Sequence, residues 1–287
     1  MLQFSHRSDR NVSAHSVDIH HHLMGAAKGT QTTDMEQVTR PSHLDEWTPS
    51  DRRRAMAWLT HFVTATGAVW GFLSLLAINE RNWQLAFVWM AMAVFVDSFD
   101  GLLARSVQVK RVLPEFDGAL LDNIIDYLNY VLVPAYFLYQ ADLLPAELRL
   151  FIPAVILLAS AYQFCQSDAK TDDHYFKGFP SYWNIVVFYM VLLQLSPWFN
   201  AAVLVFLSVM VFVPIKYIYP SRTSVFPRLT MAFGLVWAVV NLMILLRYPD
   251  FPRVWLWISL TFAVYYCGLT GYVMWQERTA SRLPRTS

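Results

Sequence analysis

Four aspartates recur at helical spacing in two short stretches of the sequence. Asp97 and Asp100 are three residues apart, and Asp122 and Asp126 are four residues apart. Residues at these spacings lie on one face of an α-helix. Four carboxylates brought together repel one another strongly unless cations lie between them. Because every donor atom is an oxygen, the pattern predicts a site for a hard divalent ion, Mg²⁺ or Mn²⁺.

Small residues and one cation accompany the acids. Gly101 and Ala104 lie on the face of the first acidic pair, and Gly118 lies one turn before the second pair. Such residues leave open space where a base or sugar approaches the backbone, although they also serve helix packing. Arg105 is suited to neutralise a diphosphate or to anchor a helix at the membrane surface. A fifth acid, Asp117, is expected to cap the second helix.

The acids belong to a chain with the composition of a membrane protein. Of its 287 residues, 56% are hydrophobic and only 15% are charged, whereas soluble domains average about 25% charged residues. The 22 Lys and Arg nearly balance the 21 Asp and Glu, which gives no indication of a nucleic-acid partner. A carboxylate at the centre of a membrane helix costs about 2.5–3.5 kcal/mol. Four of them on adjoining helices therefore indicate a function.

Apolar segments of about 20 residues, the length that crosses a bilayer, follow one another from Ala55 onward. We predict eight spans, at about 55–77, 84–105, 117–140, 148–166, 180–196, 199–219, 226–246 and 254–275. The predicted fold is an all-α polytopic membrane helix bundle. Its parts are a disordered tail at 1–44, an interfacial segment at 45–54, the membrane domain at 55–277 and a C-terminal tail at 278–287.

Eight spans place both termini on one side, and basic residues indicate which side is cytoplasmic. The loops on the side opposite the termini hold only Arg81, Arg149, Arg247 and Arg253. The side of the termini holds Arg52, Arg53, Arg54, Arg105, Lys110, Arg111, Lys170, Lys177, Lys216, Arg222, Arg228, Arg278, Arg282 and Arg285. We therefore expect cytoplasmic termini, with the acids near the cytoplasmic ends of their helices.

The four aspartates, the small residues beside them and Arg105 form one pattern along the chain. It reads Asp-x2-Asp-Gly-x2-Ala-Arg and, after a gap, Gly-x3-Asp-x3-Asp. The pattern resembles the signature of the CDP-alcohol phosphatidyltransferase family, whose six-helix core would cover the first six spans. The gap from Ser106 to Asp117 has twelve residues, where eight or nine are usual in the family. This longer gap, with the strings at 117–123 and 178–184, is similar to the bacterial phosphatidylcholine synthase branch.

The resemblance implies a reaction and roles for the motif residues. The donor would be CDP-diacylglycerol, the acceptor choline and the products phosphatidylcholine and CMP, at the cytoplasmic face of the bacterial inner membrane. Two Mn²⁺ or Mg²⁺ ions would be held by Asp97, Asp100, Asp122 and Asp126, with Asp126 also acting as general base. The residues implied to contact CDP are Asp100, Gly101, Ala104, Arg105 and Gly118.

Recognition of choline and of the lipid phosphate rests on weaker signals. A quaternary ammonium donates no hydrogen bond, so an aromatic cage is expected to hold it. The candidate cage residues, which also suit a membrane interface, are Tyr127, Tyr130, Tyr182 and Trp183. Lys216 and Arg222 are candidates for the lipid phosphate or for membrane anchoring.

Two alternatives stay open at this point. The acceptor alcohol could instead be serine, inositol or glycerol phosphate, although a phosphorylated acceptor favours a basic pocket and aromatic residues outnumber spare cations near the acids. Intramembrane acids also occur in ion-coupled transporters. Transporters usually contain internal repeats, and the sequence holds no second copy of the acidic pair of helices. The native metal and a homodimer are not decided by the sequence.

Overall fold

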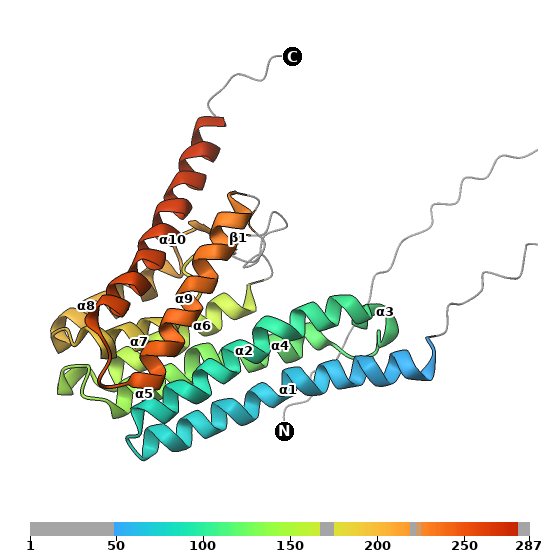
Figure 1. Ribbon diagram of the computed structural model, residues 1–287, viewed down its shortest axis with the longest axis horizontal. Helices are drawn as coiled ribbons and strands as arrows, with labels where there is room; N and C mark the ends of the chain where they lie inside the picture. Colours follow the sequence, from blue (N-terminus) through green and yellow to red (C-terminus); the bar gives the residue numbers. More distant parts are fainter. Residues whose placement is uncertain (1–48, 167–174, 219–222, 224, 281–287) are drawn as a thin grey trace, which may run out of the picture. The chain divides into compact units, whose positions relative to one another are not determined.

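A computed structural model describes residues 49–166, 175–218, 223 and 225–280. Nearly all of its elements are helical (Figure 1), and the predicted all-α bundle is confirmed. In chain order they are α1 (Asp51–Asn79), α2 (Trp83–Val107), α3 (Val109–Val112), α4 (Gly118–Tyr127), the π-helix η1 (Leu128–Leu132), α5 (Val133–Gln140), the 3₁₀-helix η2 (Ala146–Leu148), α6 (Phe151–Cys165), β1 (Tyr175–Lys177), α7 (Trp183–Leu193), α8 (Pro197–Met210), β2 (Lys216–Ile218), α9 (Pro227–Arg247) and α10 (Arg253–Ala280).

Within the described residues, five helical segments are long and apolar enough to cross a membrane: α1, α2, Ala146–Cys165, α9 and α10 up to Gln276. Large apolar side chains stand exposed on several of them, including Phe62 at 66%, Leu158 at 73% and Leu246 at 68%. In water such surface is unfavourable, whereas acyl chains cover it at no cost. The protein is therefore a multi-pass membrane protein. The other three predicted spans are helical but shorter or interrupted, and the number of crossings stays a prediction.

The structure departs from the predicted helix at 199–219. Helix α8 ends at Met210, and after an irregular stretch the chain forms β2. Pro214 lies in that stretch; it has no N–H to continue a helix and disfavours helical geometry in the residue before it. Strand β2 pairs antiparallel with β1, with Tyr175 opposite Ile218. This small two-stranded sheet joins segments about forty residues apart in the chain. No local sequence pattern indicates such a pairing.

The predicted span at 117–140 is one helical run with a π-turn inside it. Helix α4 continues through η1 into α5, so the wider turn begins directly after Tyr127. Pro134 lies at the start of α5 and cannot donate to a carbonyl one turn back. Single π-turns are frequent at functional sites. Here the π-turn follows the second acidic pair.

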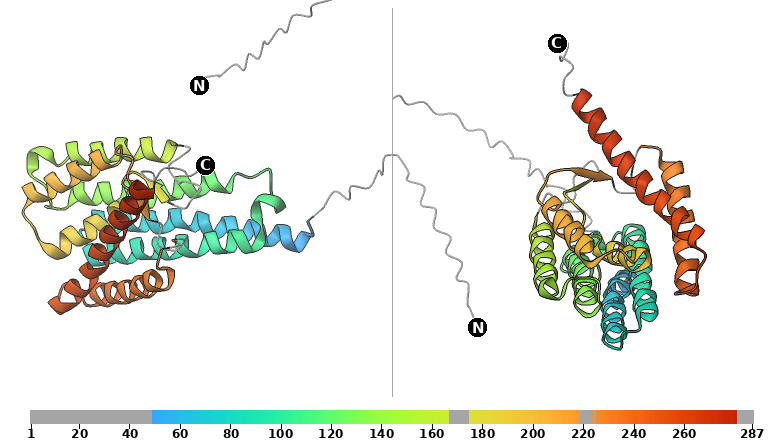
Figure 2. Two further views of the ribbon diagram at one scale, coloured as in Figure 1. Left: turned by 90° about the horizontal axis from the view of Figure 1, so that it is seen from above. Right: turned by 90° about the vertical axis from the view of Figure 1, so that its left-hand side faces the viewer.

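Helix α1 packs against both α2 and α4 (Figures 1 and 2). Gly67 of α1 permits the close approach, because a Cβ there would collide with Cγ2 of Ile125. Buried Asn129 lies on the same side of its helix and donates from Nδ2 to the Gly67 carbonyl at 3.0 Å. Helix α1 therefore fixes the position of the helix that carries Asp122 and Asp126.

The last two helices pack against each other and are tied to α7 by a polar network. Trp237 Nε1 of α9 donates to the Tyr189 hydroxyl of α7 at 2.8 Å. That hydroxyl lies 2.6 Å from Oγ of Ser259 on α10. The fully buried Ser259 donates in turn to Asn241 Oδ1 at 2.9 Å. Three helices are thus joined through side chains inside the membrane region.

Candidate active site

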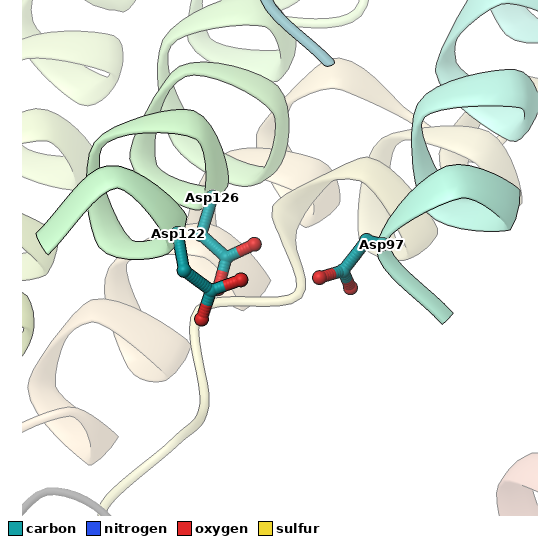
Figure 3. A group of neighbouring side chains, drawn as sticks. All are labelled: Asp97, Asp122 and Asp126. Carbon is teal, nitrogen blue, oxygen red and sulfur yellow. The ribbon is translucent and has the colours of Figure 1, made fainter. Parts of the chain in front are cut away.

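Three of the aspartates form a compact group between α2 and α4. One carboxylate oxygen from each of Asp97, Asp122 and Asp126 lies within 4.8 Å of the others. Figure 3 shows Asp122 and Asp126 projecting from one helix toward Asp97 on the other. All three side chains are partly buried. The acids therefore converge instead of pointing outward to lipid.

Asp100 lies beside this group but is more deeply enclosed. Only 5% of its surface is exposed, and Thr64 of α1 lies next to it. All four aspartates line one small cavity of about 10 Å³. A space of that size holds about one water-sized particle. The cavity has room for a small ion but not for a whole substrate molecule.

A larger cleft of about 750 Å³ adjoins the small cavity. The two share Thr64, Asp100 and Asp122 in their walls. The cleft is within the usual size of small-molecule sites, about 300–1,000 Å³. Its wall includes every residue predicted to contact CDP, namely Asp100, Gly101, Ala104, Arg105 and Gly118.

The entrance to α4 shapes one side of the cleft. Asp117 caps this helix, its Oδ1 accepting from the backbone N–H groups of Ala119 at 3.1 Å and Leu120 at 3.0 Å, so the predicted cap is confirmed. Gly118 packs directly on the His61 ring of α1, where a Cβ would collide with Cε1. Gly118 therefore permits α1 and α4 to meet beside the cleft.

Helix α3 forms another part of the wall, which the sequence did not predict. Its side chains Lys110 and Arg111 line the cleft together with Arg105. The sequence predicts these two cations only as basic residues on the cytoplasmic side of the membrane. The unusually long gap between the two motif halves was the available signal, since α3 lies within that gap.

The predicted cage residues separate into two groups, of which the first adjoins the acids. The Tyr130 hydroxyl donates to Asp97 Oδ2 at 2.8 Å. The rings of Tyr130 and Tyr182 lie 6.2 Å apart, and Phe176 of β1 contacts Tyr182 edge-on at 6.1 Å. Three aromatic rings thus extend from the acidic group to strand β1.

The second group is engaged elsewhere. Trp183 is fully buried, with its Nε1 donating to Ser160 Oγ at 2.8 Å. The Tyr127 hydroxyl donates to the Leu157 carbonyl at 2.9 Å. Lys216 lies in β2, with its Nζ 5.5 Å from the centre of the Tyr175 ring. Arg222, like the N-terminal tail, lies outside the described residues.

The donor set fits a hard divalent cation. Asp97, Asp122 and Asp126 offer carboxylate oxygens only, at mutual distances that one or more ions can bridge. Without a cation, three converging carboxylates would repel one another. The cavity beneath the cleft is thus suited to metal, and the cleft to a larger anionic molecule.

Comparison with known proteins places this site in a family. The model of the CDP-alcohol phosphatidyltransferase family matches residues 57–215, more than half of the chain. A phosphatidylcholine synthase of Legionella pneumophila is 44% identical over 223 residues, which cover 75% of this chain and 88% of that protein. One from Pseudomonas aeruginosa is 37% identical over 75% of this chain and 91% of its own length. The chain belongs to the CDP-alcohol phosphatidyltransferase family and is a membrane-bound transferase of phospholipid synthesis.

Proposed function

We propose that the protein transfers the phosphatidyl group from CDP-diacylglycerol to choline, giving phosphatidylcholine and CMP. The observation that carries the proposal is the group of three aspartates around the ion-sized cavity, which adjoins the 750 Å³ cleft through Asp122 and Asp100. The relatives named phosphatidylcholine synthase support the choice of choline.

Asp97, Asp100, Asp122 and Asp126 would hold two Mn²⁺ or Mg²⁺ ions. When bound, such ions supply positive charge to the diphosphate and to the CMP oxygen on which negative charge develops. Asp100 belongs to both cavities, so its carboxylate would face the donor as well as the metal.

The reaction displaces CMP from phosphorus. The oxygen of the choline hydroxyl forms a bond to the lipid-side phosphorus, and the bond from that phosphorus to the bridging diphosphate oxygen breaks. Asp126 accepts the proton of the hydroxyl, whose own acidity is too weak for attack at neutral pH. CMP leaves with the bridging oxygen, while Arg105 stabilises its phosphate from the cleft wall.

Choline would bind with its ammonium group at the aromatic rings of Tyr130 and Tyr182. These rings are 6.2 Å apart, and Tyr130 reaches the acidic group through Asp97. A cation over such rings is stabilised by their negative faces. The hydroxyl end of choline would then point toward Asp126. Tyr127 and Trp183 would support this cage by packing and would not contact choline, because Tyr127 bonds to Leu157 and the fully buried Trp183 bonds to Ser160.

The membrane geometry follows from the same arrangement. The acyl chains of the donor stay in the bilayer, while the cytidine enters the cleft between α1, α3 and α4. We place this cleft and both termini on the cytoplasmic side of the bacterial inner membrane, because the basic residues gather there. Lys216 would approach the lipid phosphate from β2, and Arg222 is proposed for the same role from its place in the sequence.

An acceptor screen tests the proposal. Purified protein in detergent is given CDP-diacylglycerol and Mn²⁺ with choline, serine, inositol or glycerol phosphate, and CMP release is followed. We expect CMP with choline and little with the other alcohols. Release with another alcohol alone would change the acceptor, whereas no release with any of the four alcohols would refute the proposed reaction.

A further inference from the structure

We propose that α3 is a phosphate-binding wall of the cleft, with Lys110 and Arg111 contacting the phosphates of the bound cytidine nucleotide. The inference rests on the proposed function, since it assumes a CDP-linked donor. It assigns binding residues outside the acidic motif. These residues lie in the twelve-residue gap between the two halves of the motif.

The position of α3 is fixed by its backbone. Gln108 adopts a left-handed conformation with φ 58° and ψ 46°, which ends α2 and turns the chain. Its carbonyl then accepts from the N–H of Arg111 at 2.9 Å and of Val112 at 3.1 Å. The segment after α2 is therefore a folded turn of helix, with a defined direction for each side chain.

Packing separates the apolar side chains of α3 from its charged ones, and Val109 and Leu113 line the cleft as well as Lys110 and Arg111. Val109, Val112 and Leu113 are buried, with exposures of 5%, 2% and 0%, and form a cluster with fully buried Ala57 of α1. Lys110 and Arg111 are excluded from this cluster and are exposed along the cleft. Docking of the apolar side chains on α1 thus holds α3 in place and leaves both cations exposed in the cleft wall.

The cleft wall holds both acids and cations, and one of the acids, Asp117, is engaged in capping α4. Asp100 and Asp122 lie where the cleft meets the small cavity. Three cations line the cleft as well: Arg105 from the last turn of α2, and Lys110 and Arg111 from α3. A diphosphate ester carries negative charge on both phosphates, so one end is matched by metal at the acids and the other by these cations.

The same cations have a competing explanation. Positively charged residues near a cytoplasmic helix end also attract anionic lipid headgroups. Both explanations involve phosphate, but they differ in the molecule bound. CMP has a phosphate and no acyl chain, so its binding separates the nucleotide site from attraction to the membrane surface.

The experiment measures CMP binding directly by calorimetry, with Mn²⁺ present and the protein in uncharged detergent. The variants are Lys110→Ala, Arg111→Ala and both together. Arg52→Ala is the matched control, because Arg52 is an exposed cation of α1 that is absent from the cleft wall. We expect each single change to weaken CMP binding about three- to tenfold, as for loss of one charge-assisted contact, and the control to bind as wild type. Lys110→Arg should retain most of the affinity.

Turnover gives a second readout. The KM for CDP-diacylglycerol should rise in the same variants while kcat stays within about threefold, because the contacts exist before and during the reaction. Unchanged CMP affinity in the double variant would overturn the inference. If, in addition, the KM rose only when the micelles contain anionic lipid, the two cations would instead bind lipid headgroups. Failure of wild-type protein to bind CMP would instead refute the proposed function itself.

Discussion

Tyr130→Phe tests how the acidic group is held in place. The substitution removes one hydroxyl, the group that donates to Asp97 Oδ2 at 2.8 Å, and keeps the ring that faces Tyr182. A hydrogen bond to a charged group contributes about 1.5–3 kcal/mol. Outer partners of metal ligands typically change metal affinity by about 10–100-fold. The two figures agree, since about 1.4 kcal/mol corresponds to a factor of ten.

We therefore expect the Mn²⁺ concentration for half-maximal activity to rise about 10–100-fold in Tyr130→Phe. At saturating Mn²⁺ the kcat should return to within about threefold of wild type, because Asp126 is untouched. The KM for choline should change little, since a phenylalanine ring retains the cation–π interaction. CMP release measured across buffered free Mn²⁺ gives all three quantities.

Tyr136→Phe is the matched control. It removes a hydroxyl from the same helical run, where Tyr136 contacts Asn79 Oδ1 at 3.4 Å and no acid of the site. Its Mn²⁺ dependence should equal that of wild type. If Tyr130→Phe also keeps the wild-type Mn²⁺ dependence, Asp97 is oriented by something else and the reasoning is refuted.

Three further predictions follow from single contacts. Asp126→Asn should lower the rate of CMP release at least about a thousandfold, while size-exclusion chromatography shows that the protein stays folded. Asp142→Asn alters an exposed acid paired with Arg149 and should release CMP as wild type does. Activity near wild type in Asp126→Asn would refute the assignment of Asp126 as the base. Gly118→Ala should reduce kcat/KM for the donor at least about tenfold, because the added methyl group displaces His61. In Gly101→Ala the methyl group meets only the flexible end of Arg105 at 3.3 Å, so kcat/KM should fall less. Equal kcat/KM values for the two variants would contradict this reasoning. Tyr182→Ala should raise the KM for choline about tenfold. Trp183 is fully buried, so Trp183→Phe should lower the melting temperature and leave the KM for choline nearly unchanged. A raised KM only in Trp183→Phe would assign choline binding to Trp183 instead of Tyr182.

The convergence of the acids was predictable because it depends on two regular features. Helical spacing places Asp122 and Asp126 on one face, and a short connection makes the helices that carry the two acidic pairs neighbours. The cap at Asp117 follows from the same local rules. Asp97 meets Asp122 and Asp126 within 4.8 Å, while Asp100 joins them only through the shared cavity wall. That difference depends on the relative rotation of two helices, which spacing alone does not determine.

The features that sequence reasoning missed depend on contacts between distant residues. The hydrogen bond of Tyr130 to Asp97 joins residues 33 apart in the chain, and β1 meets β2 across α7 and α8. Helix α3 is four residues long and is held by Ala57 of α1, so its own composition indicates little. By contrast, Pro214 is a local signal for the early end of α8, although the apolar residues around it favour a continuous span.

The polar network around Tyr189 bears on how the enzyme can be shortened. The family match ends at residue 215, before α9 begins. A protein cut there would retain Tyr189 but lose Trp237 and Ser259, which contact its hydroxyl. That hydroxyl would then face hydrocarbon with nothing to bind. The two C-terminal helices are therefore part of one folding unit with α7, and a minimal enzyme made by truncation would first need an apolar residue such as phenylalanine at position 189.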